Sequence, residues 1–518
     1  MELNKKRFLC AKALFIALFF FIWLLFLRFN SINSPFMRDE GEYDYAAQLL
    51  HDGGVPYKES FMQKPPMIIY TYSLAQTFGD SVSFPRILAL ISLFLAGLIL
   101  ADILRKEYNP KTAVVFLFLF SSLISFYPLE GFFAQPEIFL LLPLAISLWC
   151  YFKWKYTKRE PWLYFIGFFG LISILYKPII LLAVFFIFLY ILLFEILKNK
   201  ATFLKIIKYS SLIFLGGLSA TLIVILPIFL KGGLTYMWDS AFYYNYYYAS
   251  FVGLNFSRIF SLFIYLWPYL LLVLYFYIKD KKNNIFFLGI LFGSFFGSFG
   301  SLQLHYYLVT IPVLAMISSI SIVNLEENYS SFVNKNRRIL ITLLICFFLF
   351  FLLFFQFRDY LFIKSRNFTD YFFPECSFGQ SVLLGQELKK ITKENDGIFI
   401  FGNEPEILYY AHRKSVTRFM ITYPIILKTK LSKRYALEAL SDLKLNPPKA
   451  IITNSKLDLN ITDTQGGDIY RNTIISTIKN EYYFAGQVYS AKESNNYEFG
   501  FPIKDNNHNM NLSIYIKK

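Results

Sequence analysis

The chain has 518 residues, of which 56% are hydrophobic, and its formal net charge is +16. It contains 61 phenylalanines and 38 tyrosines, a composition that excludes an ordinary soluble protein, which needs a charged surface to stay dispersed. Apolar runs long enough to cross about 30 Å of hydrocarbon as helices recur through the first 357 residues. The sequence therefore predicts an α-helical polytopic membrane protein.

Eleven membrane spans are predicted in the N-terminal part of the chain. They fall at residues 8–29, 84–103, 111–128, 137–152, 161–176, 179–197, 207–230, 259–279, 285–300, 305–323 and 339–357. The first span is too long for the apolar region of a signal peptide and lacks a small-residue cleavage site, so we expect it to remain as an anchor. Residues 1–357 are thus interpreted as one transmembrane domain.

Basic residues gather in alternate loops between these spans. The basic loops lie at residues 5–7, 105–111, 153–159, 198–205, 279–282 and 334–338. This positive-inside pattern predicts a multi-pass protein of the cytoplasmic membrane with a cytoplasmic N-terminus. It places the loop 30–83, the loop near 230–258 and everything after residue 357 outside the cytoplasm. Because topology accounts for the charge, no nucleic-acid partner is expected.

The first outer loop, residues 30–83, is long and begins with a dense group of acids. FMRDEGEYDY at 36–45 holds four carboxylates, and the apolar residues that follow at helical spacing end at Gly53-Gly54, which predicts a helix. The apolar stretch 67–79 is too short to span a bilayer and predicts an interfacial helix. The acids therefore open a helix at the outer leaflet.

From about residue 365 the composition becomes that of a soluble domain. GIFIFG and AIITN predict buried strands, and amphipathic helices are expected at SVLLGQELKKITKEN, EILYYAHR and YALEALSDLKL. Strands that alternate with helices predict an extracytoplasmic α/β domain over residues 358–518. No glycine-rich loop follows either strand, which excludes the usual phosphate loop of a nucleotide site.

Several ionisable residues are expected on the outer face. Asp39 and Glu40 open the first helix, where favourable interaction with the helix dipole is the alternative explanation. The others are Lys64 in QKPP, Glu137 in AQPE, Lys177 in LYKPII and His305 in LQLHYYL. Charged groups at membrane depth are costly and usually face a cavity. Together they predict an active site at the outer interface.

Simpler explanations exist for some of these residues. Glu137 follows Pro136 at a predicted helix start, so dipole stabilisation could account for it, and His305 could be an ordinary interfacial histidine. Lys177 departs from the positive-inside pattern, which favours a function. The tyrosine-rich segment 242–250 is interpreted as an aromatic belt rather than a platform for stacking sugars.

The motifs RDEGEYDYAAQLL, QKPPMIIYTYSLAQTFG and AQPE together resemble the membrane glycosyltransferases of the protein O-mannosyltransferase type, family 39 and its relatives. These share the GT-C fold with the lipid A aminoarabinose transferases. LYKPII and LHYYLVTIPVLA match further family positions, although relatives often carry Arg where this chain has His305. The resemblance covers roughly residues 1–357.

The resemblance implies an inverting transfer of a single sugar from a polyprenyl-phosphate donor to an acceptor hydroxyl or phosphate on the outer face. It implies that Asp39 is the base, with Glu40 supporting it and Glu137 orienting the acceptor or the base. Lys64, Lys177 and His305 would contact the donor phosphate. No cofactor is expected; a divalent metal on a Glu–His pair is the alternative. The expected partners are the lipid-linked sugar, membrane lipids, and a lipid, glycan or protein acceptor.

Other functions compete with this interpretation. An oligosaccharide ligase or polymerase also has many spans, but its large outer loop usually comes late in the chain. A transporter of lipid-linked sugars should carry charges inside its spans and show broken helices in paired positions. A ligand sensor needs far fewer spans. The early acid-rich loop favours the monosaccharide transferase.

Overall fold

The structure is a computed structural model that divides the chain into two compact units. The residues it describes are 2–193, 202–252, 256–280, 283–299, 303–328, 335–374, 376, 378–454, 465–490, 497–500 and 512–518. The first, the helical unit, comprises Met1–Phe29, Arg86–Val224 and Gly253–Phe362. The second, the mixed unit, comprises Asn30–Pro85, Ile225–Val252 and Ile363–Lys518.

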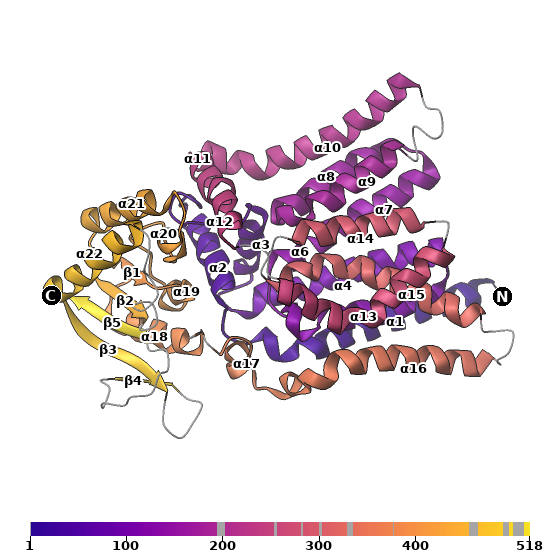
Figure 1. Ribbon diagram of the computed structural model, residues 1–518. Coiled ribbons are helices and arrows are strands. Elements are labelled where there is room, and N and C mark those ends of the chain that lie inside the picture. The colour runs from indigo at the N-terminus through magenta and orange to yellow at the C-terminus, as the bar shows by residue number, and fades with distance from the viewer. Residues whose placement is uncertain are drawn as a thin grey trace. The chain divides into compact units, whose positions relative to one another are not determined.

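The helical unit is built from long apolar helices (Figure 1). Its elements, some of which run a few residues past the unit's borders, are α1 (Glu2–Ile32), α4 (Ser83–Glu107), α5 (Pro110–Ile124), η1 (Tyr127–Leu129), α6 (Pro136–Phe139), α7 (Leu141–Thr157), α8 (Pro161–Tyr176), η2 (Pro178–Ile180), α9 (Leu181–Tyr190), α10 (Phe203–Leu230), α13 (Phe256–Lys279), α14 (Asn284–Ser298), η5 (Leu304–Thr310), α15 (Ile311–Asn328), α16 (Lys335–Phe354) and η7 (Phe355–Phe362). The principal packed pairs are α7 with α8, α9 with α14, and α15 with both α5 and α13.

Each of the eleven predicted spans coincides with an apolar helix. Six helices in the described part of the chain are long and apolar enough to cross a membrane: Ala11–Ile32, Ser83–Glu107, Pro136–Thr157, Phe203–Leu230, Ile259–Lys279 and Leu304–Asn328. Five shorter apolar helices accompany them: Pro110–Ile124, Pro161–Tyr176, Pro178–Leu193, Asn284–Ser298 and Ile339–Phe354. The predicted class, a polytopic helical membrane protein, is confirmed.

Small residues let these helices approach one another closely. A Cβ on Gly167 of α8 would lie 1.9 Å from the carbonyl oxygen of Ile213 in α10, and one on Gly216 would lie 1.9 Å from that of Tyr164. On the buried helix α15, Ser321 Oγ donates to the carbonyl oxygen of Leu272 in α13 at 2.7 Å. Close contact through small residues and interhelical hydrogen bonds replaces the hydrophobic effect, which is absent between helices in lipid.

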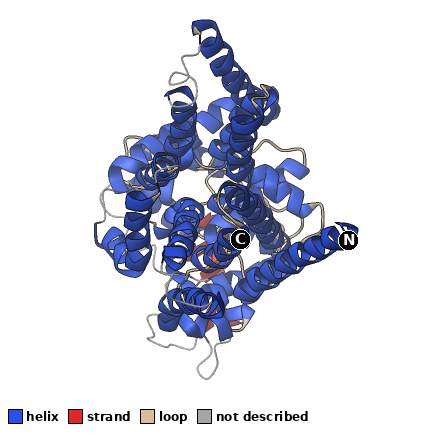
Figure 2. Cartoon of the chain, turned by 90° about the vertical axis from the view of Figure 1, so that its right-hand side faces the viewer, coloured by secondary structure: helices blue, strands red, loops and turns tan. Residues whose placement is uncertain are grey.

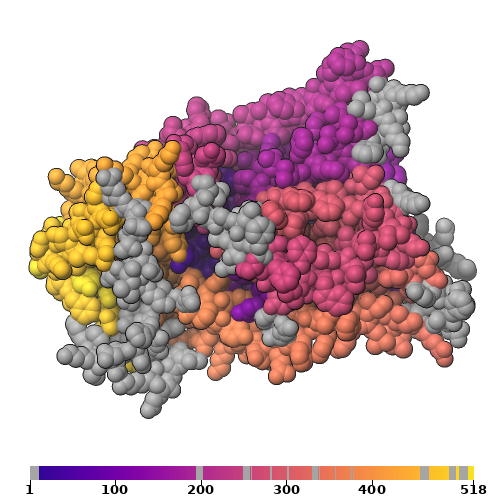
Figure 3. Space-filling view, viewed as in Figure 1, coloured from indigo at the N-terminus to yellow at the C-terminus, as the bar shows by residue number. Residues whose placement is uncertain are grey.

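Several helices of this unit present apolar side chains outward, α13 and α16 among them. The exposed large hydrophobic residues of α13 include Phe260 and Trp267, and those of α16 include Phe347. Both helices lie at the surface in the space-filling view (Figure 3). A surface of this composition is suited to lipid rather than water.

The mixed unit contains all the described strands (Figure 2). Its elements are α2 (Arg38–His51), α3 (Met67–Gln76), α11 (Leu234–Met237), η4 (Trp238–Tyr243), α12 (Tyr244–Val252), α17 (Ser365–Phe372), α18 (Phe378–Ile391), β1 (Ile398–Phe401), α19 (Glu406–Ala411), α20 (Tyr423–Ile426), α21 (Ser432–Leu445), β2 (Ala450–Asn454), α22 (Gln465–Glu481), β3 (Tyr482–Ser490), β4 (Tyr497–Gly500) and β5 (Leu512–Lys517). The strands form one sheet in the order β1-β2-β5-β3-β4.

Two of the strands in this sheet, β1 and β2, were predicted from the sequence, and the other described strands were not. The strands β1 and β2 pair in parallel, with Ile400 opposite Ile452, and both fall on the segments predicted as strands, as α18, α19 and α21 fall on predicted helices. β5 joins β2 in antiparallel fashion, and β3 and β4 extend the sheet further. The predicted α/β fold of this region is confirmed, with an antiparallel addition.

Three separate segments share the core of the mixed unit. Phe61 of the first loop stacks on Phe419 at a centroid distance of 5.2 Å and meets Tyr244 edge-on at 5.3 Å. Tyr244 is completely buried, so the aromatic-belt interpretation of 242–250 is wrong for this residue. Its ring packs inside the core cluster of this unit. The assignment of 358–518 as a separate domain stays a prediction.

Candidate functional site

Four polar side chains meet inside the helical unit, and we call them the paired cluster: Glu130, Glu137, Lys177 and His305. Lys177 is placed by Pro178, because a residue before proline is driven out of the helical conformation. It accordingly ends α8 in an extended conformation, with φ −158° and ψ 124°. Glu137 lies in the first turn of α6 and His305 in η5.

The cluster pairs acids with bases at short range. Lys177 Nζ forms an ion pair with Glu137 Oε1, and His305 Nε2 lies 3.7 Å from the same oxygen. The other ring nitrogen, His305 Nδ1, lies 3.0 Å from Glu130 Oε2. Lys177 Nζ also stands 3.4 Å from the ring centroid of Tyr306, within cation–π range. The structure thus brings together three of the six predicted site residues.

Burial makes this cluster costly unless it is used or fully paired. Glu137 is completely buried, and Lys177 and His305 are 5% and 6% exposed. Glu137 Oε2 has no hydrogen-bond partner among the described residues. A buried carboxylate oxygen without a donor carries a desolvation penalty of about 1–3 kcal/mol. The cluster therefore retains acceptor capacity that its own side chains do not satisfy.

Glu130 is a member of the cluster that sequence reasoning missed. It adopts a left-handed conformation, φ 54° and ψ 25°, directly after η1. The turn around it is fixed by the buried Arg28, whose guanidinium donates to Ser125 Oγ at 2.6 Å and to the carbonyl oxygen of Gly131 at 3.3 Å. The available signal was a lone acid before glycine in YPLEG, a pattern that ordinary turns share.

Asp39 and Glu40 lie at the start of α2 in the mixed unit, in different surroundings. Glu40 is completely buried, and its Oε2 accepts a hydrogen bond from the backbone N–H of Met37 at 3.1 Å, as in a capping box. Asp39 is partly exposed, and its Oδ2 lies 3.4 Å from Tyr43 Oη. Glu40 thus secures the helix start, while Asp39 is accessible.

Lys64 lies in the same unit, near a third acid of α2. It is partly exposed, and its carbonyl oxygen accepts a hydrogen bond from Tyr57 Oη at 2.8 Å. Burial, and secondarily the charge of Asp39, raises the pKa of Glu42 to about 8, although the charges of Lys64 and Arg38 oppose the shift. Asp39, Glu42 and Lys64 therefore act on one another electrostatically.

Glu42 forms an acid cluster with Glu404 and Glu406, which α19 and the loop before it bring to α2. A Cβ on Gly41 would lie 2.5 Å from the Cα of Glu406, so only glycine allows this approach. Burial, and secondarily the charge of Glu404, raises the pKa of Glu406 to about 8. Burial also raises the pKa of Glu404, although Arg38 opposes the shift.

Arg38 is a cation beside these acids. Its Nε donates to the carbonyl oxygen of Asn403 at 2.5 Å, and its guanidinium lies 5.2 Å from the ring centroid of Tyr423. Burial alone would lower the pKa of Arg38, but Tyr423 and Glu404 raise it above its usual value. Arg38 therefore keeps a fixed positive charge next to carboxyls that are readily protonated.

No metal centre is evident in the described residues. Within them, no group of three or more His, Cys, Asp or Glu side chains is arranged to hold a metal ion. The nearest approach to the predicted Glu–His pair is His305 with Glu130 and Glu137. Lys177 pairs with the same oxygen of Glu137 that His305 faces, and a positively charged neighbour does not suit a bound cation. The expectation that no metal is required stays a prediction.

Comparison with known proteins places the fold. Residues 63–229 match the family described as dolichyl-phosphate-mannose-protein mannosyltransferase. ArnT from Cupriavidus metallidurans bound to undecaprenyl phosphate superposes with a TM-score of 0.58 at 9% identity, over 96% of this chain and 98% of ArnT. This is the GT-C fold of membrane glycosyltransferases. The predicted resemblance to the O-mannosyltransferase and aminoarabinose transferase type is confirmed.

Two further GT-C structures support the assignment. ArnT from Cupriavidus metallidurans in the apo state gives a TM-score of 0.59 at 10% identity, over 97% of this chain and 98% of ArnT. The archaeal oligosaccharyltransferase AglB from Archaeoglobus fulgidus, in complex with an inhibitory peptide and a dolichol-phosphate, gives 0.51 at 13% identity, over 96% of this chain and 75% of AglB. Among curated proteins no sequence matches the chain. The chain thus shares the fold of these membrane proteins, and its apolar helices indicate a multi-pass membrane protein.

Proposed function

We propose that this GT-C protein is an inverting glycosyltransferase that moves a single sugar from a polyprenyl-phosphate donor to an acceptor hydroxyl or phosphate. The observation that carries the proposal is the paired cluster: a lysine held at 5% exposure among apolar helices, against a completely buried glutamate. Ionisable groups in such surroundings are expensive and mark a substrate path more often than a structural contact. The leaving group of the proposed reaction is a phosphate, which needs cations.

The proposed step is a single displacement. The acceptor oxygen attacks the anomeric carbon, the bond from that carbon to the phosphate oxygen breaks, and polyprenyl phosphate leaves with the bonding electrons. The base takes the acceptor proton. One displacement inverts the anomeric configuration. The step needs no oxidant, reductant or nucleotide, only cations for the phosphate and a carboxylate for the proton.

Each predicted residue has a role in this proposal. Asp39 is the base, which agrees with its partial exposure, and Glu40 holds the start of α2 in place through its cap. Glu137 orients a reacting group with its unpartnered Oε2. Lys64 and Lys177 supply charge to the donor phosphate. His305 is proposed to assist them, although its ring nitrogens face Glu130 and Glu137.

The identity of the donor lipid rests on the comparisons. ArnT was solved with undecaprenyl phosphate and AglB with a dolichol-phosphate. Both ligands share the polyprenyl-phosphate part, which we propose is the part that this protein binds. We further propose that the protein lies in the cytoplasmic membrane with its N-terminus inside and residues 358–518 outside, as the basic loops indicate. Labelling of single cysteines in intact cells tests this orientation.

A second candidate is the transfer of a preassembled glycan. The likeness to AglB, an oligosaccharyltransferase, favours it. The acid-rich first loop and the higher TM-scores of the ArnT structures favour transfer of one sugar. The two candidates differ in the size of the group that moves, so one assay distinguishes them.

The test is transfer by the purified full chain from radiolabelled polyprenyl-phosphate monosaccharides into a membrane extract. Asp39→Asn is the matched control, because it keeps the size of the side chain while removing the base. We expect label in one acceptor class with the wild type, and a rate at least about 10²-fold lower with the variant. A variant that keeps most of its activity would show that Asp39 is not the base. Transfer only from lipid-linked oligosaccharides would favour the second candidate.

A further inference from the structure

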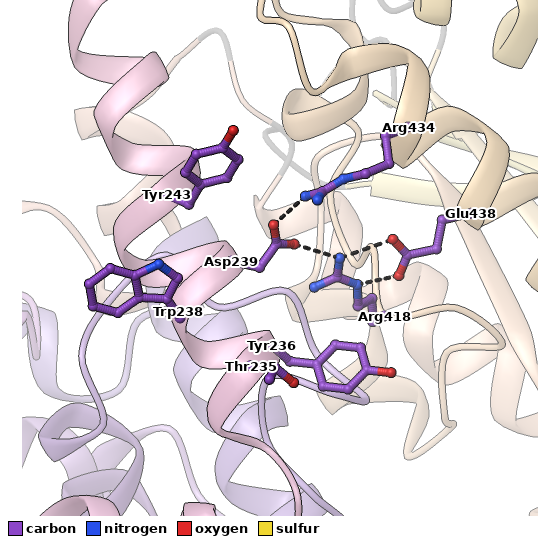
Figure 4. A pocket seen from close by; sticks show the side chains of 8 residues that line it. All are labelled: Thr235, Tyr236, Trp238, Asp239, Tyr243, Arg418, Arg434 and Glu438. Atoms are coloured by element: carbon purple, nitrogen blue, oxygen red, sulfur yellow. Dashed lines mark hydrogen bonds and ion pairs between the residues drawn. The ribbon is translucent and has the colours of Figure 1, made fainter.

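A pocket in the mixed unit is assigned no role by the proposed reaction. Its volume is about 490 Å³. It opens between α21 on one side and the two consecutive helices α11 and η4 on the other (Figure 4). Its lining consists of Thr235, Tyr236, Trp238, Asp239, Tyr243, Arg418, Arg434 and Glu438. Four of these side chains are charged and three are aromatic. The lining therefore offers both charged groups and aromatic rings to a ligand.

The charged residues form a closed network (Figure 4). Arg418 binds Glu438 through two hydrogen bonds, Nε to Oε1 at 2.6 Å and Nη2 to Oε2 at 3.0 Å. Its Nη2 also donates to Asp239 Oδ2 at 2.9 Å, and Arg434 pairs with Asp239 Oδ1. Two guanidinium groups thus face two carboxylates, and the pocket has no net charge. A ligand of either sign would have to disrupt pairs that already exist.

Arg418 is held rigidly and still has a donor to offer. Its side chain is 4% exposed, and its guanidinium lies 4.9 Å from the ring centroid of Phe419 and 5.1 Å from that of Phe61. Its Nη1 is buried and has no hydrogen-bond partner among the described residues. A fixed guanidinium with one unsatisfied donor, beside two carboxylates, offers both donors and acceptors in planar pairs.

The aromatic residues beside this network are unusually exposed. Trp238 is 62% exposed and Tyr243 is 41% exposed, and in Figure 4 both lie on the same helical segment as Asp239. Rings of this kind provide flat apolar contact area together with a polar edge. A pocket that combines apolar faces with a few fixed polar groups is typical of small-ligand sites.

We propose that this pocket binds a neutral saccharide, and that the saccharide is part of the acceptor. A pyranose presents an apolar face of C–H groups, which suits the exposed rings, and adjacent hydroxyls, which can both donate to Asp239 and Glu438 and accept from Arg418. The balanced charge disfavours phosphates and sugar acids. This inference rests on the proposed function and names its acceptor class as a neutral glycan, because the donor phosphate is assigned to other residues.

The direct test is equilibrium binding to the purified full chain without donor. The probes are fluorescent disaccharides of glucose, mannose, galactose and N-acetylglucosamine, beside their glucuronic acid and 6-phosphate counterparts. Trp238→Ala removes a ring of the pocket, and Tyr246→Ala removes a 74% exposed ring of the same segment that does not line it. We expect a neutral disaccharide to bind, with at least about tenfold weaker binding for Trp238→Ala and unchanged binding for Tyr246→Ala.

Several outcomes would overturn the inference. Tighter binding of the acidic or phosphorylated probes would exclude a neutral ligand. If Trp238→Ala and Tyr246→Ala weaken saccharide binding equally, Trp238 makes no specific contact with the saccharide. An absence of neutral disaccharide binding at millimolar concentration, by a wild-type protein that is folded, would refute the saccharide site.

Transfer kinetics separate this inference from the proposed function. If the protein transfers sugar, Trp238→Ala should raise the apparent KM for a neutral glycan acceptor at least about tenfold while leaving the donor KM unchanged. If the wild type transfers sugar and Trp238→Ala has the same acceptor KM, the pocket does not bind the acceptor. The proposed reaction itself would not be affected by that result. The wild type could instead transfer no sugar but still bind a saccharide, with Trp238→Ala abolishing the binding. That result would support the binding site and refute only the proposed reaction.

Discussion

The two units bury ionisable side chains in opposite ways. In the helical unit, each acid of the paired cluster faces a lysine or a histidine: Glu137 meets Lys177 and His305, and Glu130 meets His305. In the mixed unit, Glu42, Glu404 and Glu406 share Arg38 as a common cation, with Lys64 acting on Glu42. The first cluster is balanced and the second is rich in acid.

This difference determines what each region can do. In the paired cluster every acid has a basic side chain as its neighbour, which offsets part of the cost of burying it. In the mixed unit, burial and then the charge of neighbouring carboxylates raise the pKa values of Glu42 and Glu406 to about 8, so these carboxyls hold their protons more readily. The helical unit thus holds acids and bases against one another among its apolar helices. The mixed unit is suited to respond to pH near the accessible Asp39.

The largest effect is expected from removing the cation of the balanced cluster. Lys177→Met leaves the completely buried Glu137 with His305 as its only nearby base among the described residues. Breaking a buried pair by removing one partner costs about 3–5 kcal/mol. We expect a marked fall in the apparent melting temperature of the purified protein in detergent, measured by static light scattering or intrinsic fluorescence.

Two further variants test whether charge imbalance is the cause. Lys177→Met combined with Glu137→Gln should recover most of the stability but none of the transfer activity, since the buried charge is gone. Lys208→Met breaks the exposed pair with Glu160 and should change stability by less than about 1 kcal/mol. If the double variant is as unstable as the single one, packing of the lysine rather than its charge is what matters.

A second prediction concerns the contact that buries the acids of the mixed unit. Gly41→Ala would place a methyl group 2.5 Å from the Cα of Glu406, and no flexible side chain can yield there. Such overpacking costs about 1–3 kcal/mol. We expect a lower melting temperature for this variant. Gly53→Asn is its control, since nothing lies within 4 Å of a Cβ there and asparagine tolerates its φ of +80°.

Individual helices could be predicted from local sequence patterns, whereas contacts between distant residues could not. The apolar runs predicted the helices of the helical unit because lipid demands long, uninterrupted apolar segments. The meeting of Glu130 with His305 joins residues 175 positions apart, and no local pattern encodes that contact. Similarly, nothing in the acid-rich stretch 36–45 predicts that Glu42 and Asp44 are buried. For Glu42 part of the cause is Glu406, which lies 364 positions later.

The antiparallel strands of the sheet were also not predicted from the sequence. β3 contains Gly486, and its pairing with β5 is interrupted by a register shift between Phe484 and Gly486. Such a strand alternates poorly, so its period of two is hidden. Tyr244 illustrates a related failure, because a tyrosine-rich stretch near a membrane is typical of an interface and only the position of Phe61 shows that one ring belongs to a core.

A third prediction uses pH to compare the two clusters. Burial raises the pKa of Glu406 from its usual 4.5 to about 8. Between these values the unfolded state has released its proton while the folded state retains it, so stability falls as pH rises from about 4.5 to 8. Glu406→Gln removes this proton while Ser381 can still donate to the side-chain oxygen. The variant should therefore lose less stability over this range.

The measurement is the apparent melting temperature at a series of pH values. At pH 8 we expect Glu406→Gln to melt above the wild type by on the order of 2–4 °C, and at pH 4.5 to melt at nearly the same temperature. Glu394→Gln, at an exposed position, should follow the wild type. Removing a charge would then stabilise the acid-rich cluster and destabilise the balanced one. Parallel curves for wild type and Glu406→Gln would contradict the shifted pKa.

The smallest effect is expected from Lys64, which lies at the edge of the acid-rich region rather than inside a buried pair. Its partial exposure means that solvent stabilises the charges around it, so Lys64→Ala should change the melting temperature little. If its charge serves the donor phosphate, the variant should instead show a several-fold higher apparent KM for the polyprenyl-phosphate sugar. Lys58→Ala, an exposed lysine of the same loop, is the control. An unchanged donor KM together with a shifted pH–rate profile would mean that Lys64 acts through the pKa of Glu42, which its charge lowers, and not on the donor.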